Sequence, residues 1–214
     1  MPTRTSQGPT RTDRRRVETR RRLLGAARDL IAEKGVGAMR TSEITDRADV
    51  GAGSFYNHFA DKDEIVAALL AELAEEQGAL VDELTRGIDD PAEVVSFAHR
   101  HFVRLALRDP SFGQLVIRLN ASHGLMQRTL GHRALRDIQA GIEIGRFKVA
   151  DPLPVVYATG GALLGTIAGV VDGSLCEGAD QDHAAAVLRM LGLEADEAGA
   201  ISALPIDRGR SGGS

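Results

Sequence analysis

The chain has 214 residues, of which 43% are hydrophobic and 26% are charged, so it can bury one small and one medium-sized core. Its net charge of −4 argues against a protein that coats nucleic acid through charge alone. The single cysteine, Cys176, excludes a disulfide framework and a cysteine-rich zinc site, and it suits a reducing compartment.

Positive charge is concentrated at the N-terminus. Residues 1–28 hold nine arginines against two acidic residues, a local charge of +7, whereas the rest of the chain carries about −11. Residues 1–16 are rich in Thr, Arg, Pro and Ser and have no apolar period, which predicts a disordered basic arm. The arginines at 14–16 could follow a DNA backbone or enter its minor groove; otherwise the arm is a solvated tail.

The next segment predicts a supporting helix followed by two very short helices. Apolar residues continue at helical spacing up to Gly35, which ends the first helix. Thr41 is a good N-cap for the second helix, and Asp49-Val50-Gly51 tolerates the left-handed backbone of a tight turn. The third helix carries Phe55 and Phe59 on its buried side. Because a helix of about two turns is not stable alone, this pattern indicates a helix-turn-helix, which presents such a helix to the DNA major groove.

One run of sequence resembles a known family. Gly53-Ser54-Phe55-Tyr56-Asn57-His58-Phe59, followed by Asp61-Lys62-Asp63-Glu64, is similar to the DNA-binding segment of the tetracycline-repressor (TetR) family of bacterial transcriptional regulators. The resemblance covers roughly residues 17–66. The remainder is similar to the family only in its length and in being all-helical. Two positions depart from the family pattern. Ala52 stands where Lys or Arg is common, which removes one basic contact, and Asp49 stands where Gly is frequent.

The resemblance implies roles for individual residues. The start of the first short helix would bind phosphate through hydroxyl and backbone N–H groups. Ala52 and Ser54 would face base edges. Tyr56, His58 and Lys62 would contact phosphates, although Tyr56 and His58 could instead be ordinary packed residues. The expected DNA-contacting residues are Arg40, Thr41, Ser42, Gly51, Ala52, Gly53, Ser54, Tyr56, Asn57, His58 and Lys62.

A long helix and a larger helical body follow. Asp61 and Glu64 predict a capping-box start for a helix that runs to about Arg86. Beyond Pro91, breaks are expected where Pro and Gly interrupt helix, at Asp109-Pro110, His123-Gly124, Asp151-Pro152 and Gly178. The expected helices span 91–108, 111–120, 124–147, 152–173 and 181–193. The absence of sustained period-two alternation argues against strands.

These patterns predict an all-α fold. An N-terminal three-helix DNA-binding domain with a helix-turn-helix is joined by a long helix to a larger helical domain for ligand binding and dimerisation. The expected boundaries are a disordered arm at 1–16, a DNA-binding domain at 17–66, the larger domain at 67–206, and a disordered tail at 207–214.

The uncharged segment from Leu153 to Val171 is long enough to span a membrane or to form an interface. Glycines at four-residue spacing indicate close approach of another helix, in lipid or between proteins. We prefer a protein interface, because Pro and Thr lower the hydrophobicity and no N-terminal signal is visible. The expected dimer interface comprises Gly161, Gly165, Gly169, Gly173, Leu188 and Leu191.

Signatures of enzymes are missing from the sequence, so we expect no catalytic residues, metal or cofactor. His99 and His101 are two residues apart and point to nearly opposite sides of a helix, which argues against a shared metal site. His101 could border a ligand pocket, or it could be a satisfied core histidine. The expected pocket residues are His101, Phe102, Leu105, Phe112, Leu115 and Leu119.

The sequence thus predicts a cytoplasmic, nucleoid-associated regulator of transcription. It would bind a palindromic double-stranded DNA operator as a homodimer, act as a repressor and be released by a small-molecule effector. The alternatives are a constitutive DNA-binding architectural protein without a ligand, and a single-span membrane protein with a cytosolic DNA-binding head.

Overall fold

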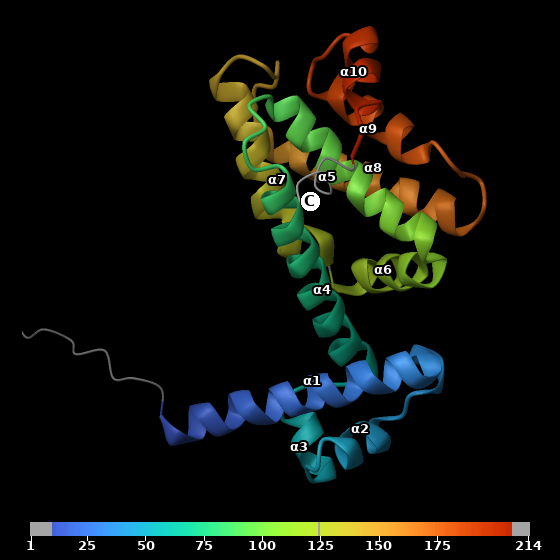
Figure 1. Cartoon of the computed structure of the whole chain (residues 1–214). Coiled ribbons are helices and arrows are strands. Elements are labelled where there is room, and N and C mark those ends of the chain that lie inside the picture. The colour runs from blue at the N-terminus through green and yellow to red at the C-terminus, as the bar shows by residue number, and fades with distance from the viewer. Residues whose placement is uncertain (1–9, 124, 207–214) are drawn as a thin grey trace, which may run out of the picture. The chain divides into compact units, whose positions relative to one another are not determined.

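The computed structural model describes residues 10–123 and 125–206, with side chains described for all of these except 118–127. Over these residues all regular secondary structure is helical, with helices α1 to α10 joined by turns and loops and no strand (Figure 1). The chain divides into two units, the first ending at Leu70 and the second beginning at Ala71. The predicted all-α class is confirmed.

The first unit contains α1 (Arg11–Ala38), α2 (Thr41–Arg47), α3 (Ala52–Tyr56) and the first part of α4 (Lys62–Leu84). Its core forms because each helix has an apolar side that the others cover. Phe55 and Phe59 are both buried, and their ring centroids lie 5.7 Å apart. The predicted burial of both residues is confirmed, but α3 is shorter than predicted: it ends at Tyr56, and Phe59 follows it. The other fully buried side chains include Leu23, Ala27, Ile44 and Ile65.

The N-terminal arm is shorter than predicted, because α1 already begins at Arg11. Thr10 caps this helix: its hydroxyl accepts from the Asp13 backbone N–H at 3.2 Å, and the Asp13 carboxylate accepts from the Thr10 N–H at 3.0 Å. This capping box starts a helix that needs no apolar period, since Arg is a good helix former. Disorder was thus wrong for residues 11–16. Residues 1–9 and the predicted tail at 207–214 lie outside the described residues.

Two boundaries in the first unit differ slightly from expectation. Gly35 interrupts α1 where the helix was predicted to end, with φ of 76°, a backbone conformation that favours glycine. The helix nevertheless resumes to Ala38. Arg40, and not Thr41, is the N-cap of α2, because the Glu43 carboxylate accepts the Arg40 backbone N–H at 2.9 Å.

The second unit contains the rest of α4 and six further helices. These are α5 (Pro91–Arg108), α6 (Pro110–His123), α7 (Leu125–Glu143), α8 (Pro152–Val171), α9 (Ala179–Met190) and α10 (Ala195–Ser202). The predicted breaks separate α5 from α6, α6 from α7, α7 from α8, and α8 from α9. Asp90 and Asp151 cap α5 and α8 in front of a proline, which is a favourable first helical residue. Helix α10 was not predicted from the sequence.

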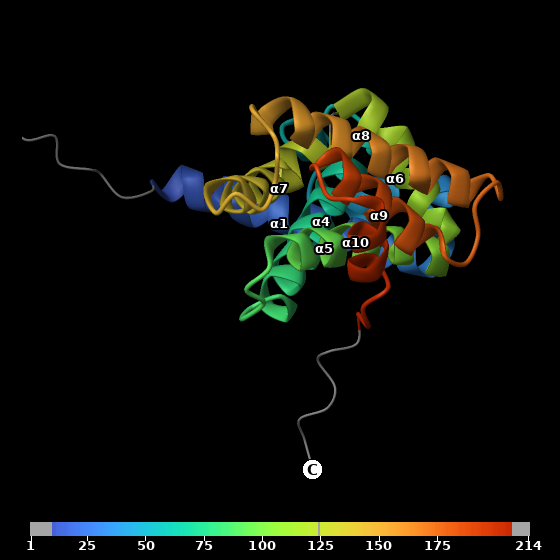
Figure 2. The same ribbon diagram turned by 90° about the horizontal axis from the view of Figure 1, so that it is seen from above.

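Helix α5 is the centre of the second unit and packs against every helix from α6 to α10. Figures 1 and 2 both show α8 and α9 lying side by side, in agreement with the contacts between them. A buried ion pair fixes α5 to α9: Arg100 Nε donates to Asp180 Oδ2 at 3.1 Å, and Arg104 Nε donates to the same oxygen at 2.8 Å. Arg100 also donates to the Leu204 carbonyl at 2.5 Å, which secures the segment after α10.

Helix α8 has one buried and one exposed face, and both are apolar. Leu163 and Ile167 pack in the core, whereas Leu153 and Tyr157 are more than half exposed. Among the described residues, α8 is the one helix long and apolar enough to cross a membrane, and 28% of its most apolar 18-residue window is buried. One helix of this length and composition is weak evidence for a membrane span, and α8 contacts α5, α6, α7 and α9. The turn after α8 carries the exposed thiol of Cys176.

The four glycines at four-residue spacing along and just after α8 fall into two pairs. At Gly161 and Gly165, a Cβ atom would meet no other atom within 4 Å, so these positions are open. Gly169 packs against the Leu175 side chain of the same subunit, and Gly173 follows the helix with φ of 80°. These two glycines are therefore explained within one chain.

Two predicted interface leucines are corrected by the structure. Leu188 and Leu191 are fully buried in a core cluster of their own subunit. They have no surface to offer to a partner chain. Both leucines lie at the C-terminal end of α9, on the side that faces the core.

Candidate functional site

The first candidate surface lies on α2, α3 and the start of α4. Tyr56 is 65% exposed although its neighbour Phe55 is completely buried. Phe55 therefore packs in the core, whereas Tyr56 faces solvent. Gly51, Ala52, Gly53 and Asn57 are exposed, and Ser54 and His58 are half-buried. On the α2 side, Arg40 and Ser42 are exposed and Thr41 is half-buried. The structure thus brings all the expected DNA-contacting residues together within the first unit.

The turn between α2 and α3 is held from α1. Asp49 has φ of 50°, the left-handed conformation that its position in the turn requires. The Arg22 guanidinium donates to the Asp49 carbonyl at 2.8 Å and to the Asp49 carboxylate at 3.0 Å. The carboxylate of Asp49 thus gives Arg22 a second acceptor that Gly would lack.

Basic residues of α1 lie near α3, a proximity that was not predicted from the sequence. Arg20 stacks on the Phe59 ring, with 4.6 Å from the guanidinium carbon to the ring centroid. Burial, with smaller effects from the nearby Arg16 and Arg20 charges, lowers the pKa of His58. If a helix had been predicted over residues 11–22 in place of a disordered arm, Arg16 and Arg20 would have been expected one helical turn apart, on the same side.

Lys62 is partly occupied by the protein itself. Its Nζ donates to the Val36 carbonyl at 3.3 Å, close to the C-terminal end of α1. The side chain is half-buried, so it retains access to solvent. A lysine ammonium has three donor hydrogens, so this contact leaves capacity for a phosphate.

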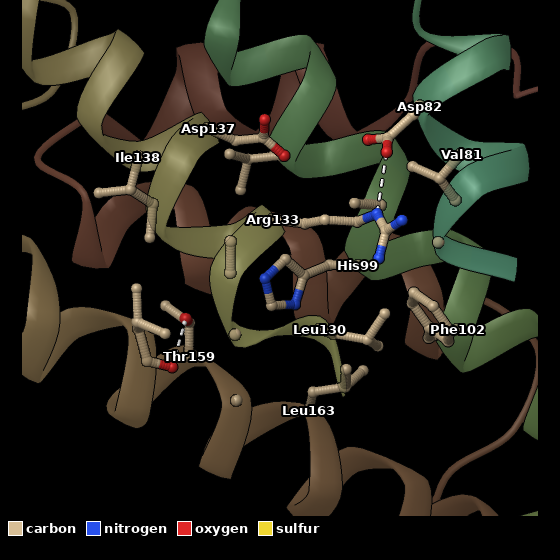
Figure 3. A pocket seen from close by; sticks show the side chains of 17 residues that line it. Val81, Asp82, His99, Phe102, Leu130, Arg133, Asp137, Ile138, Thr159 and Leu163 are labelled. Carbon is tan, nitrogen blue, oxygen red and sulfur yellow. Dashed lines mark hydrogen bonds and ion pairs between the residues drawn. The ribbon is translucent and has the colours of Figure 1, made fainter. Parts of the chain in front are cut away.

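The second candidate site is a cavity of about 90 Å³ inside the second unit. It is lined by residues of α4, α5, α7 and α8, most of them apolar, as Figure 3 shows. Phe102, Leu130, Ile138 and Leu163 supply much of the apolar lining, and Thr159 lies on the α8 side. Such a chamber suits a small, largely apolar molecule that carries a few polar groups.

The charged residues Asp82, Arg133 and Asp137 line one wall of the cavity, and Glu75 and Arg136, which do not line it, pair with them. Arg133 of α7 donates from Nε to Asp82 Oδ2 of α4 at 2.8 Å, and from both terminal nitrogens to Glu75 at 2.8 and 2.7 Å. Arg136 donates to Asp82 Oδ1 at 2.7 Å and to Asp137 at 2.8 Å. Together these residues form a network in which each arginine contacts two carboxylates.

The two cavity carboxylates differ in their electrostatics. Burial acts to raise the pKa of Asp82, but hydrogen bonds from Arg136 and Arg133 outweigh it, so the pKa falls below its ordinary value. Burial raises the pKa of Asp137, because its single Arg136 partner compensates less than the two partners of Asp82. Asp137 is thus the less satisfied carboxylate of the wall.

Gly78 of α4 makes this wall possible. A Cβ atom at this position would lie 3.0 Å from Leu130 and 3.1 Å from Arg133 Nε and Nη1. Glycine at this position avoids contacts that would otherwise push Leu130 or the Arg133 guanidinium away from the α4 backbone.

A chain of three hydrogen-bonded side chains leads away from the cavity. His99, which lines the cavity, contacts His183 from its Nδ1 to Nε2 at 2.9 Å. His183 Nδ1 in turn lies 2.9 Å from Thr166 Oγ1. Burial lowers the pKa of His99 to about 3 and that of His183 to about 4, so both rings are neutral at pH 7.

The structure places most of the expected pocket residues elsewhere. Of the members whose side chains the structure describes, only Phe102 lines the cavity. His101 bonds to Gln77 at 2.9 Å and stacks on Phe97, so the satisfied-histidine alternative describes it, and His99 faces the cavity instead. Leu105 and Phe112 pack against a core cluster, and Leu115 is half-buried outside the cavity lining. The Leu119 side chain lies outside the described residues.

Two family models match the chain, one on each side of the unit boundary. The model described as bacterial regulatory proteins of the tetR family matches residues 23–69. The model described as tetracyclin repressor-like, C-terminal domain, matches residues 90–203, which is more than half of the chain. The chain belongs to the tetracycline-repressor family.

Solved structures agree with this membership. The chain is 38% identical to RolR in its crystal structure with the ligand resorcinol, with a TM-score of 0.81, covering 90% of this chain and 97% of RolR. Against RolR without ligand, the identity is 39% and the TM-score is 0.76, covering 86% of this chain and 97% of RolR.

Curated TetR-type relatives are regulators of transcription. The repressor Rv3405c of Mycobacterium tuberculosis is 33% identical over 106 residues, which are 46% of this chain and 54% of the relative. The repressor AcnR of Corynebacterium diphtheriae is 27% identical over 180 residues, 80% of this chain and 88% of the relative. The chain spans 34% and 54% of the length of the first curated relatives that it matches. As a TetR-family member, the chain is a transcriptional regulator.

Proposed function

We propose that this regulator is a cytoplasmic repressor that binds a palindromic operator as a homodimer and is released by a small-molecule effector. The observation that carries the proposal is the cavity, which joins a charged wall to an apolar lining in a chain 38% identical to resorcinol-bound RolR. The repressors among its curated relatives favour repression over activation.

The exposed surface of the first unit supports the DNA-binding part of the proposal. Ala52 and Ser54 are small enough to meet base edges or a thymine methyl group in the major groove. Tyr56 and Lys62 would bind phosphates. Arg16, on the helical part of what was predicted to be an arm, would add a phosphate contact, because it lies close enough to His58 to influence its pKa.

The outer face of α8 supports dimerisation. Leu153 and Tyr157 are exposed, and the open positions at Gly161 and Gly165 continue the same face of the helix. Met190 of α9 is also exposed. An uncharged face with glycine in its middle is suited to close packing against the same face of a second copy, and a two-fold axis would bring identical patches together.

The cavity supports a small hydroxylated aromatic molecule as the effector class. Its apolar lining suits one aromatic ring, and Asp137 is a hydrogen-bond acceptor with a raised pKa on the polar wall. A ligand hydroxyl that donates to Asp137 would satisfy a carboxylate that Arg136 alone supports. RolR takes resorcinol, a ring with two hydroxyls.

Binding-site selection followed by a release assay tests the proposal. Selection from random DNA with the full chain should return an inverted repeat, and resorcinol should release the chain from that DNA in a mobility-shift assay. Asp137→Asn, which is nearly isosteric, should bind the same DNA but require more resorcinol. A consensus without two-fold symmetry would contradict the homodimer. Unchanged binding across a panel of mono- and dihydroxybenzenes would favour the constitutive architectural protein.

A further inference from the structure

The hydrogen-bond chain behind the cavity has a direction that its partners determine. Thr166 has one hydroxyl hydrogen, and its oxygen lies 3.0 Å from the Ala162 carbonyl, which can only accept. If Thr166 donates to that carbonyl, His183 must donate from Nδ1 to Thr166. His183 Nε2 then accepts, and His99 must donate from Nδ1. In this arrangement all three contacts are hydrogen bonds.

The opposite direction uses one hydrogen bond fewer. If Thr166 donated to His183 Nδ1, the bond to Ala162 would be lost, and His99 would carry its proton on Nε2. Both rings are neutral, so each has a single N–H to place. The count of hydrogen bonds therefore favours His99 with its proton on Nδ1 and a lone pair on Nε2.

His99 Nε2 is accessible from the cavity. His99 is a lining residue, and Figure 3 shows its ring projecting among Arg133, Leu130 and Thr159. Its contact with His183 is made through Nδ1. Among the described residues, the only fully buried side-chain nitrogen or oxygen atom without a hydrogen-bond partner is Ser96 Oγ. His99 is half-buried, and no described side chain bonds to its Nε2, so this nitrogen is available to a molecule in the cavity that His99 lines.

We infer that His99 Nε2 is a specificity-determining acceptor that binds a hydroxyl of the effector, and that His183 and Thr166 are positioning residues that hold it in this form. The inference rests on the proposed ligand class and deepens it. Asp137 on the polar wall would receive one hydroxyl, and His99 would receive a second one elsewhere on the ring.

An acceptor at this place selects among similar molecules. A hydroxyl can donate to Nε2, whereas a methyl or methoxy group leaves the lone pair unsatisfied in a largely apolar chamber, which costs binding free energy. A carboxylate would meet a lone pair instead of a donor. The site therefore favours a dihydroxybenzene over its methylated or carboxylated analogues. Because Thr166 lies on α8 and His183 on α9, the ligand hydroxyl is also connected to both helices of the proposed dimer face.

A pair of probes measures the contribution of His99. Resorcinol and 3-methylphenol differ by one hydroxyl replaced with a methyl group, so the second hydroxyl is tested while the ring remains. In titration calorimetry with the full chain, we expect His99→Phe to lower the preference for resorcinol over 3-methylphenol by about tenfold or more. Affinity for 3-methylphenol should change by less than about threefold. Ile138→Val, a matched change in the apolar lining, should affect both probes alike.

Each outcome has a definite meaning. If wild type binds both probes and a folded His99→Phe variant keeps the full preference for resorcinol, the assignment of His99 is overturned while the ligand class stands. If wild type binds neither probe at millimolar concentration, the ligand class is overturned and the assignment falls with it.

A second measurement needs no variant at the cavity. Nitrogen-15 NMR of histidine-labelled wild type distinguishes the two neutral tautomers, and it should show the His99 proton on Nδ1, with Nε2 shifted when resorcinol binds. A proton on Nε2 in the ligand-free chain would overturn the inference even if His99→Phe does not fold. Thr166→Val, outside the cavity lining, should mix the two tautomers and lower the resorcinol preference by about threefold. A merely structural role for Thr166 would leave both readouts unchanged.

Discussion

At the scale of single residues, Lys62 has both a partner inside the protein and a proposed partner on DNA. Its ammonium group donates to the Val36 carbonyl, so removing it affects the first unit as well as the DNA contact. The two effects differ in their dependence on salt, because only a phosphate contact releases counterions. That difference separates them experimentally.

For Lys62→Ala we expect weaker binding to all DNA sequences. The slope of log affinity against log salt should fall by roughly one unit per half-site. Binding measured by fluorescence anisotropy over a salt series checks this, with a melting curve to correct for lost stability. Tyr56→Phe is the matched control: it removes a hydroxyl and no charge, so it should weaken binding while leaving the slope unchanged. A Lys62→Ala slope equal to wild type would place Lys62 away from the backbone.

Ser54 tests the orientation of the recognition helix. It is half-buried on α3, beside the exposed Ala52 and Gly53. Ser54→Arg should change the preferred operator sequence more than the total affinity, since arginine reads guanine by two hydrogen bonds in the major groove. Repeating the selection from random DNA with the variant measures this. The same consensus for both proteins would show that Ser54 does not face the bases.

The histidine pair predicts a pH dependence of stability. The folded pKa values of His99 and His183, about 3 and about 4, lie below the ordinary value of 6.5. The unfolded chain therefore binds more protons, and stability should fall as pH drops below about 6.5, by about 2 kcal/mol per histidine at pH 5. Chemical denaturation at pH 7.5 and pH 5 checks this. His183→Gln should flatten the loss, and the exposed His132→Gln should not.

At the scale of elements, α8 separates packing within a subunit from packing between subunits. Gly165 is open in the single chain, whereas Gly169 is covered by Leu175, and a Cβ atom at Gly169 would lie only 2.8 Å from that side chain. A leucine at Gly165 should therefore change the equilibrium between dimer and monomer, whereas a leucine at Gly169 should change the folding equilibrium of the single chain.

Gly165→Leu should leave the melting temperature of the monomer nearly unchanged and shift the chain from dimer towards monomer. Overpacking a close contact typically costs about 1–3 kcal/mol, and a two-fold interface places the change in both subunits. Operator binding should be lost although the first unit is untouched. Light scattering with mobility shift checks both. Gly169→Leu should instead lower the melting temperature. A Gly165→Leu chain that stays a tight, operator-binding dimer would place the interface elsewhere.

The pairing of α5 with α9 depends on one buried carboxylate. Asp180 accepts from both Arg100 and Arg104, and Arg100 is itself buried. Asp180→Asn leaves a buried guanidinium without its counter-charge, so the free energy of unfolding should fall by about 3–5 kcal/mol. Urea denaturation measures this. Asp182→Asn, an exposed position on the same helix, should change it little, and an equal effect at both positions would contradict the role of the ion pair.

At the scale of the whole molecule, features fixed by neighbouring residues were predictable from sequence. Proline and glycine marked the ends of α5, α6 and α8, and the burial of Phe55 in α3 and of Phe59 just after it was predicted from the aromatic pattern. The cavity was not predictable in this way. Asp82 and Arg133 come from helices that are distant in sequence, and only tertiary packing decides that His99 of α5 faces the chamber while His101 turns towards Gln77.

The exposed thiol of Cys176 has a practical consequence for studying the intact regulator. It is the only cysteine of the chain, and it lies in the turn between α8 and α9. A maleimide dye or a nitroxide spin label would therefore attach at one defined position without any engineered mutation. In a dimer of labelled chains, pulsed electron resonance would yield one label-to-label distance. Its change on adding resorcinol would follow the effector response in solution, in the presence or absence of DNA.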